Sequence, residues 1–250
     1  MLSIAADVTA AINAEIDKIE DWQRPGNRKG QYYIDIVADK VAVSMLSAAN
    51  FSVLSEETGF VSGNNGYLAI VDPLDGSTNA SKHLPWYAVS ICFLRDLEIQ
   101  VARVENLGSP TIFEAIRSGG ATKNGNQITV DTSAEFDKAV VGISSLPSAP
   151  LGSWQFRCLG AAALDLCCIA SRSLEAYVDY GNDTHGVWDY IAGIFIAQEA
   201  GAVVGEVWDR DLITTDYLAR RAPIAACSQP IFDTLLSGRR DNSKRQSAVS

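Results

Sequence analysis

The alternation of apolar and polar positions gives the first part of the chain two helices followed by several strands. Amphipathic helices are predicted over about residues 3–22 and 34–49, separated by the breaker-rich segment "RPGNRKGQ". "FSVLSEETG" and "GYLAIV" then predict short strands. "WYAVSICFL" and "EIQVARVEN", joined at Arg95-Asp96, predict an antiparallel hairpin, and "TIFEAI" and "QITV" continue it as a meander. This order is typical of an α+β arrangement.

The second part of the chain alternates strands and helices. "KAVVGISS" and "LEAYVDY" predict strands around the buried helix "LGAAALDLCCIAS", and "WDYIAGIFIAQEA" predicts a helix that Gly201 ends. "AVVGEVW" and "PIAACS" add strands, and "QPIFDTLLSG" predicts a last helix. Alternation of this kind favours an α/β half behind the α+β half, with a seam near residues 145–152. The predicted organisation is 1–147, 148–238 and a tail, 239–250, whose polar and basic composition predicts disorder.

Composition narrows the class of protein. The 250 residues are 47% apolar and carry a formal net charge of −10, which disfavours nucleic acid and anionic membranes as partners. The first helix carries acids throughout and has no long apolar core, so it predicts neither a signal peptide nor a membrane span, and the expected location is the cytoplasm. The five cysteines have no paired spacing, which favours buried free thiols.

Two carboxylates end the apolar stretch "GYLAIV", in the sequence "VDPLDGSTN". Asp72 and Asp75, with the Leu74 carbonyl between them, suit a hard divalent cation. Gly76 permits an unusual turn, and Ser77 begins a run of residues that cap helices well, so open amides there suit a phosphate oxygen. Taken alone, an acidic turn with a capping box is the simpler interpretation of this stretch.

Other acids lie at comparable ends of elements. Glu56 follows the strand "VLS", and Asp189 lies at the start of an apolar helix, where interaction with the helix dipole is the simpler account of that residue alone. Three ends of predicted strands or helices that carry carboxylates, in one acidic protein, together indicate a metal site. A site with several carboxylates and no histidine cluster selects Mg²⁺ or Mn²⁺ over Zn²⁺.

"SEE", "DPLDGSTN" and "WDYIAGIFIAQEAG", in this order and at these separations, resemble the inositol monophosphatase family, with weaker support from "IFEAIRSGGATKNG" and "FRCLGAAALDLCCIA". The resemblance covers about residues 32–205. It implies a layered α-β-α-β-α fold, a magnesium-dependent, lithium-sensitive phosphomonoesterase that uses metal-activated water, and a homodimer. The apolar strands "YAVSICF" and "IQVARV" are candidates for the dimer interface. A catalytically weak regulatory relative is the competing class.

The same resemblance assigns roles to individual residues. Glu56, Asp72 and the Leu74 carbonyl would hold one magnesium ion, and Asp72, Asp75 and Asp189 a second, with Glu56 also a ligand of a weaker third. The amides of Gly76 and Ser77 would receive the phosphate, and the Ser77 hydroxyl would orient the attacking water. An upstream aspartate supports that hydroxyl in the family. Asp39 is the candidate here, although "DIVAD" spaces its two aspartates four apart where the family has six.

The substrate side departs further from the family pattern. Arg157 and the run Gly160, Ala161, Ala162 match a family stretch that lines the substrate. Asn182 stands where inositol phosphatases carry a glutamate that binds sugar hydroxyls, and Asp183 follows it, so these two residues are candidates to read a polyol. His185, Trp86 and Trp188 are interpreted as structural. The predicted substrate is an inositol phosphate-like polyol or sugar phosphate, and histidinol phosphate, fructose bisphosphate and a nucleotide 3'-phosphate stay open.

Overall fold

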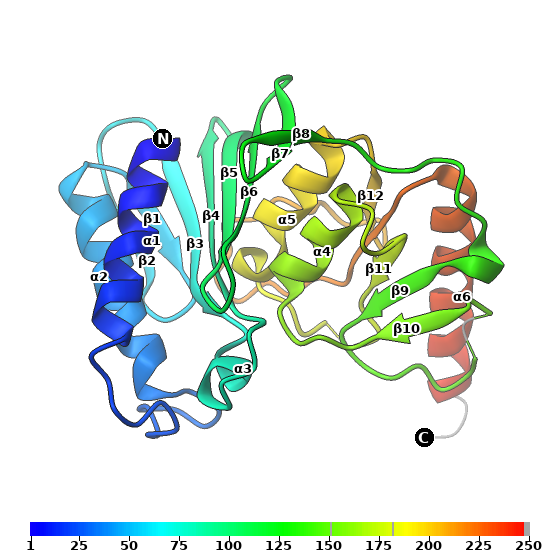
Figure 1. Cartoon of the computed structure of the whole chain (residues 1–250), viewed down its shortest axis with the longest axis horizontal. Coiled ribbons are helices and arrows are strands. Elements are labelled where there is room, and N and C mark those ends of the chain that lie inside the picture. Colours follow the sequence, from blue (N-terminus) through cyan, green and yellow to red (C-terminus); the bar gives the residue numbers. More distant parts are fainter. Residues whose placement is uncertain (151, 182, 248–250) are drawn as a thin grey trace.

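The computed structural model describes residues 1–150, 152–181 and 183–247. Five layers follow one another across the molecule (Figure 1): a helix pair, an eight-stranded sheet, a second helix pair, a five-stranded sheet and a last helix. This is the layered α-β-α-β-α architecture expected from the sequence. The helices are α1 Leu2–Ile16, α2 Tyr33–Ala48, α3 Ser77–Ser81, α4 Ala162–Ala170, α5 Val187–Glu199 and α6 Gln229–Ser247, with a 3₁₀ turn η1 Phe136–Lys138.

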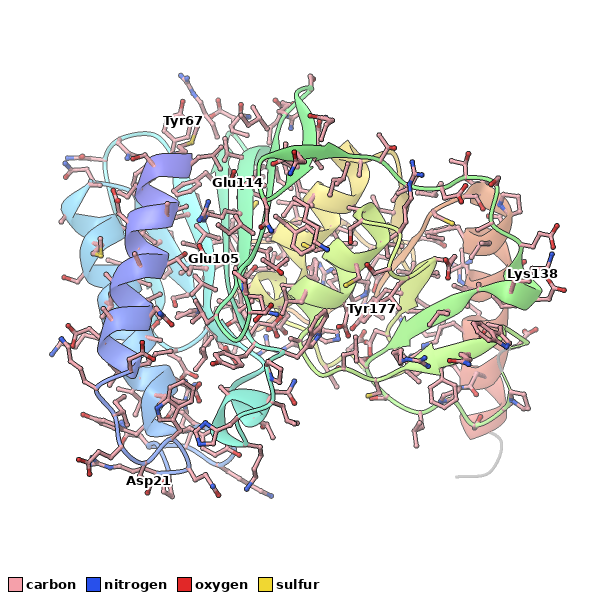
Figure 2. The ribbon with its side chains drawn as sticks, viewed as in Figure 1. Asp21, Tyr67, Glu105, Glu114, Lys138 and Tyr177 are labelled. Carbon is pink, nitrogen blue, oxygen red and sulfur yellow. The ribbon has the colours of Figure 1, made fainter. Side chains whose placement is uncertain are left out.

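The eight-stranded sheet has the order β2-β1-β3-β4-β5-β6-β7-β8. Only β1 and β3 run parallel, and each later strand is antiparallel to its neighbour, as the predicted hairpin and meander require. Arg103 of β5 is buried and pairs with Glu105 and with Glu114 of β6, both labelled in Figure 2. The strands are β1 Ser52–Ser55, β2 Gly59–Val61, β3 Leu68–Asp75, β4 Ala88–Arg95, β5 Glu98–Asn106, β6 Thr111–Ile116, β7 Gly120–Lys123 and β8 Asn126–Ile128.

The five-stranded sheet has the order β10-β9-β11-β13-β12, with β10, β9 and β11 parallel. Its strands are β9 Val140–Ile143, β10 Gln155–Arg157, β11 Ala176–Val178, β12 Val203–Glu206 and β13 Pro223–Ala226. The chain therefore changes sheet between residues 128 and 140, before the predicted seam at 145–152. Division of the chain at 147 stays a prediction.

Two apolar cores lie on opposite faces of the eight-stranded sheet. One core joins α1 and α2 to one face, through residues such as Ile12, Ile34 and Val71. The other joins the opposite face to α4, α5 and the five-stranded sheet, and includes all of the apolar residues of α4. Because α4 and α5 lie between the sheets, their N-terminal ends can meet the ends of strands from the first sheet. No helix in the described part of the chain is long and apolar enough to cross a membrane.

Three expectations about elements are corrected by the structure. The first helix ends at Ile16 instead of near residue 22, because the chain turns at residues 17–22 and brings Ile19 and Trp22 against the first core. The strands β2, β7 and β10, each three or four residues long, were not predicted. The strands β4 and β5, proposed as a dimer interface, are internal and largely buried between helix layers, so they present no free face.

The predicted disordered tail is also wrong over most of its length. Helix α6 continues to Ser247, past residue 239 where disorder was expected. Arg239 is only 1% exposed, and its guanidinium donates to the carbonyls of Asp179 and Gly181, both at 2.7 Å. Some of the basic residues that suggested a disordered tail therefore belong to α6, and one of them, Arg239, is buried and anchors this helix to the rest of the protein.

Candidate active site

The end of strand β3 forms the centre of the site. Asp72 and Asp75 are both buried there, and the pairing register with β4 shifts between them. Pro73 lies at this shift, where its missing N–H removes one bond of the ladder. The Leu74 amide donates to Asp72 Oδ1 at 2.9 Å, which fixes that carboxylate at the rim of the sheet.

Gly76 is the residue that lets the chain turn from β3 into α3. It has φ of 84°, in the left-handed region, and a Cβ there would lie 2.9 Å from the Trp86 carbonyl oxygen and 3.0 Å from Ala161 Cβ. A side chain at this position is excluded both by the backbone conformation and by the two neighbours. The close approach also places Gly160 and Ala161, from the second half of the chain, directly against the loop that carries Ser77.

Three carboxylates from three elements converge at the rim of the sheet. Glu56 follows β1, Asp72 belongs to β3, and Asp189 lies in the first turn of α5. One carboxylate oxygen from each residue lies within 4.8 Å of the other two, so these three side chains are close enough together to bind one metal ion. Asp189 is oriented by the Gly186 amide, which donates to its Oδ2 at 2.7 Å. The structure therefore brings together three of the four side chains proposed as metal ligands.

Asp75, the fourth proposed carboxylate, lies beside this group. Its Oδ2 accepts a hydrogen bond from the Ala163 amide at 2.8 Å, at the N-terminal end of α4. Its pKa is held well above the usual range by burial and then by the charge of Asp189. Asp75 therefore connects the rim of the first sheet to the helices between the sheets, and within the described part of the chain its Oδ1 accepts no hydrogen bond.

The electrostatics of the group call for a cation. The pKa of Glu56 is raised to about 8, first by burial and then by the charges of Asp189 and Asp35. Burial, followed by the charge of Glu56, likewise raises the pKa of Asp72 well above its usual range. Buried like charges disfavour one another unless a positive charge compensates them. A divalent cation bound by carboxylate oxygens supplies that charge.

The aspartate that faces Ser77 is Asp35, and the prediction of Asp39 is wrong. The Asp39 carboxylate instead accepts hydrogen bonds from the hydroxyls of Ser55 and Thr58, which flank Glu56 in the sequence. Burial raises the pKa of Asp35 to about 6, against the opposing effects of the Tyr32 amide and the Ser77 side chain. Oδ2 of Asp35 accepts the Tyr32 amide at 2.7 Å, and Oδ1 is buried without a hydrogen-bond partner among the described residues.

The proposed substrate-side residues have different environments. Gly160 and Ala161 contact the Gly76 loop, and Ala162 begins α4 beside it. Arg157 is exposed, and its guanidinium donates to Gln155 Oε1 and to the Phe156 carbonyl. Arg210 forms two hydrogen bonds with the exposed Asp183, one to each carboxylate oxygen. Asn182 lies outside the described residues.

His185 connects the site to a buried polar network, which agrees with the structural role expected for it. Its Nδ1 lies 3.4 Å from Asp189 Oδ2, and its Nε2 lies 3.1 Å from the hydroxyl of Tyr177, the buried residue labelled in Figure 2. Burial lowers the pKa of His185, but the neighbouring Asp189 and Asp179 carboxylates outweigh that effect and raise it overall. His185 thus helps to fix the orientation of one proposed metal ligand.

A cavity of about 300 Å³ opens beside the carboxylate group. Its lining includes Asp35, Glu56 and Ser77. The other lining residues were not predicted as site residues from the sequence: residues 28–31, Glu57, Trp188, Tyr217 and Arg220. The Tyr217 hydroxyl donates to the Glu56 carbonyl at 2.7 Å and so connects this part of the lining to Glu56. Tyr217 and Arg220 carry no sequence signal, since they lie in an irregular segment far from the recognised motifs.

The fold and the carboxylate group define a class: an α-β-α-β-α protein with an acidic centre at the rim of its larger sheet. Residues 26–244 match the sequence profile of the Inositol monophosphatase family, and the chain belongs to that family.

Relatives and solved structures agree with this assignment. The chain is 30% identical over 208 residues to a fructose-1,6-bisphosphatase/inositol-1-monophosphatase of Archaeoglobus fulgidus, covering 81% of each chain. It is 32% identical over 209 residues to the Nus factor SuhB of Vibrio cholerae, covering 77% of this chain and 76% of that protein. A Pyrococcus horikoshii structure, described by its similarities to inositol-1 monophosphatase, superposes with a TM-score of 0.85 at 27% identity, covering 94% of this chain and 96% of the other.

Proposed function

We propose that the protein is a magnesium-dependent phosphomonoesterase that hydrolyses a small phosphorylated metabolite by metal-activated water. The observation that carries the proposal is the convergence of Glu56, Asp72 and Asp189 within 4.8 Å, beside a cavity that also contains Ser77. Family membership over residues 26–244 supports the same conclusion. We expect lithium to inhibit the activity, as the family resemblance implies.

The donor set fits magnesium, with manganese as an alternative. All of the converging side-chain ligands are carboxylates, which hard divalent cations prefer, and a bound cation would relieve their crowded negative charge in place of protons. We assign Glu56, Asp72 and the Leu74 carbonyl to one ion, Asp72, Asp75 and Asp189 to a second, and Glu56 to a weaker third. When bound, such ions lower the pKa of water and stabilise charge on phosphate oxygens.

The protein groups orient the phosphate and the water. In this proposal the amides of Gly76 and Ser77 donate to phosphate oxygens, at the turn that only glycine permits. The Ser77 hydroxyl accepts a hydrogen bond from the attacking water and donates its own proton toward Asp35. Oδ1 of Asp35 is buried and unpartnered among the described residues, so it is available to receive that hydrogen bond. The pKa of about 6 leaves Asp35 mostly ionised at neutral pH, as an acceptor must be.

For the substrate we propose a polyol or sugar phosphate. Gly160, Ala161 and Ala162 lie against the phosphate loop, where the leaving alcohol would have to pass. Arg157, Asn182 and Asp183 stay proposed contacts of that alcohol. The bidentate pairing with Arg210 holds the Asp183 carboxylate in one orientation, which suits recognition of hydroxyl groups. Relatives named fructose-1,6-bisphosphatase support a sugar phosphate, and histidinol phosphate and nucleotide 3'-phosphates are the remaining alternatives.

A regulatory role is the second candidate function. It is favoured by the relatives that carry the name Nus factor SuhB. The retention of the carboxylate group argues for catalysis, because a purely regulatory protein would have no need to keep buried charges that repel one another.

We also propose that the protein forms a homodimer in the cytoplasm. The supporting surface is the edge of the five-stranded sheet, where β10 has a free side and Phe156 is 49% exposed. Leu146 and Trp154, in the segment leading to that strand, are 71% and 66% exposed. Large apolar side chains gathered beside an open strand edge favour association of two copies.

The proposed activity is tested with a panel of inositol, sugar, histidinol and nucleotide phosphates, with and without magnesium. Release of phosphate that requires magnesium is expected for at least one polyol or sugar phosphate. The matched control is Asp72→Asn, which should lower kcat by at least about 10²-fold because it removes a charge shared by two ions. If no substrate is turned over by protein shown to bind magnesium, the regulatory role replaces the enzyme.

A further inference from the structure

The lining of the cavity beside Ser77 contains two cations that no carboxylate neutralises among the described residues. Of its three basic residues, Arg28 pairs with Glu57, whose side chain is 11% exposed and also accepts a hydrogen bond from Gln31. Neither Lys29 nor Arg220 has an acidic partner within 4.0 Å in the described part of the chain. In a protein with a net charge of −10, two unpaired cations beside a group of carboxylates suggest that the cavity binds an anion.

Arg220 is held in place before any ligand binds. Its guanidinium lies 5.2 Å from the centre of the Trp188 ring, and Nη1 donates to the carbonyls of Tyr217 and Ala219 at 2.9 and 3.0 Å. Trp188 is 3% exposed and its ring lies 5.2 Å from that of Tyr217, so the support is rigid. Nε and Nη2 of Arg220 have no partner among the described residues, which leaves donors free for a ligand in the cavity.

Lys29 adds a second cation to the lining, from the loop before α2. It is exposed and lines the same cavity as Arg220 and Ser77. A fixed, planar guanidinium and an ammonium on a flexible stem in one cavity are a combination that suits a phosphate oxyanion. The cavity, at about 300 Å³, has room for such a group beside the one at the metal carboxylates.

We propose that Lys29 and Arg220 form a second oxyanion subsite, which binds a phosphate group next to the phosphate held at the metal centre. The inference rests on the proposed phosphatase function and names a further specificity element of the same site. The phosphate comes from one of two sources: the second phosphate of a bisphosphorylated substrate, or free inorganic phosphate. The site chemistry is the same for both, so the experiment separates them.

The test compares wild-type protein with the double variant Lys29→Gln/Arg220→Gln. The matched control is Arg221→Gln, which loses a charge at the next position but whose guanidinium donates to the carbonyls of Asp211 and Arg220 and does not line the cavity. Three quantities are measured: kcat/KM for a hexose bisphosphate and for the matching monophosphate, the Ki of inorganic phosphate, and calorimetric binding of inorganic phosphate to the magnesium-loaded protein.

If the subsite binds a substrate phosphate, the double variant lowers the ratio of bisphosphate to monophosphate kcat/KM by about tenfold, the effect of losing charge-assisted hydrogen bonds. If it binds free phosphate, that ratio is unchanged, the Ki rises by about tenfold, and calorimetry shows one phosphate fewer. Equal behaviour of the double variant and Arg221→Gln in all three measurements overturns the subsite. Absence of turnover in the wild type would defeat the proposed function alone, because the calorimetric comparison still decides whether Lys29 and Arg220 bind phosphate.

Discussion

Asp35 and Asp39 lie one helical turn apart on α2 and face different partners. Asp35 faces Ser77, whereas Asp39 accepts hydrogen bonds from the hydroxyls of Ser55 and Thr58. We expect Asp35→Asn to lower kcat by about 10²-fold, because it weakens the acceptor that orients Ser77. Asp39→Asn should instead lower the free energy of unfolding by about 1–3 kcal/mol through its two weakened hydrogen bonds.

Steady-state kinetics and urea unfolding of both variants measure these effects. Each variant is the control for the other, since the same chemical change is made one turn away. A larger loss of kcat in Asp39→Asn than in Asp35→Asn would restore the assignment made from the sequence.

The crowded carboxylates also make the stability of the metal-free protein depend on pH. The folded-state pKa of Glu56, about 8, lies above the ordinary value of 4.5, so the folded protein binds this proton more tightly than the unfolded chain does. The stabilisation is therefore complete below about pH 4.5 and is lost as the pH rises through about 8. Asp35, with a pKa of about 6, contributes in the same direction at lower pH.

We expect the melting temperature in EDTA to fall between about pH 5 and pH 8, apart from acid effects elsewhere in the molecule. Saturating magnesium should flatten this dependence, because the bound cation replaces the protons. The comparison of melting curves with EDTA and with magnesium across this range is the measurement. Equal slopes under both conditions would show that the carboxylate group does not bind the ion.

For single residues, the sequence predicted which carboxylates converge, but it did not predict which aspartate lies beside Ser77. Glu56, Asp72 and Asp189 were found because each follows or begins a strongly apolar element, and their convergence is borne out. The choice between Asp35 and Asp39 was wrong because residues four apart on a helix share one face. The sequence pattern therefore cannot tell which of the two contacts the loop that carries Ser77.

Among the elements, α6 differs most from expectation. Its apolar first part was predicted, but its polar second part was taken for a tail, because helix packing through one buried arginine leaves no apolar periodicity to read. The short strands β2, β7 and β10 were missed for a related reason. Three or four residues are too few to show alternation, and their pairing depends on neighbouring strands.

The docking of α6 gives a prediction about stability. Arg239→Ala should lower the free energy of unfolding by about 2–4 kcal/mol, because it leaves the carbonyls of Asp179 and Gly181 without their donor. The adjacent Arg240→Ala is the matched control. Its guanidinium donates to the Val207 carbonyl at 2.7 Å and pairs with Asp209 at the surface, where water can replace the lost donor, so we expect a smaller change, within about 1 kcal/mol. Denaturant unfolding measures both. Similar values for the two variants would mean that the helix is held by its apolar residues alone.

For the whole molecule, the exposed apolar edge at β10 predicts the state of association. We expect light scattering at micromolar concentration to give the mass of two chains, and Trp154→Ser/Phe156→Ser to shift the protein toward the monomer by removing apolar area from the interface. Leu218→Ser, at an exposed leucine far along the chain from this edge, is the control and should leave the mass unchanged. A wild-type protein that is monomeric throughout this range would contradict the proposed dimer.

The position of α4 and α5 between the sheets has a consequence for synthesis of the chain. The eight-stranded sheet is complete in sequence by Ile128, but the helices that cover its second face come only at residues 162–170 and 187–199. While these are still being made by the ribosome, the nascent chain has one apolar face without cover and two carboxylates, Glu56 and Asp72, whose partner Asp189 does not yet exist. Emergence of α5 covers the second face of the eight-stranded sheet and supplies Asp189 together, so this face is buried and the carboxylate group becomes complete at the same point in translation, before β12, β13 and α6 finish the core.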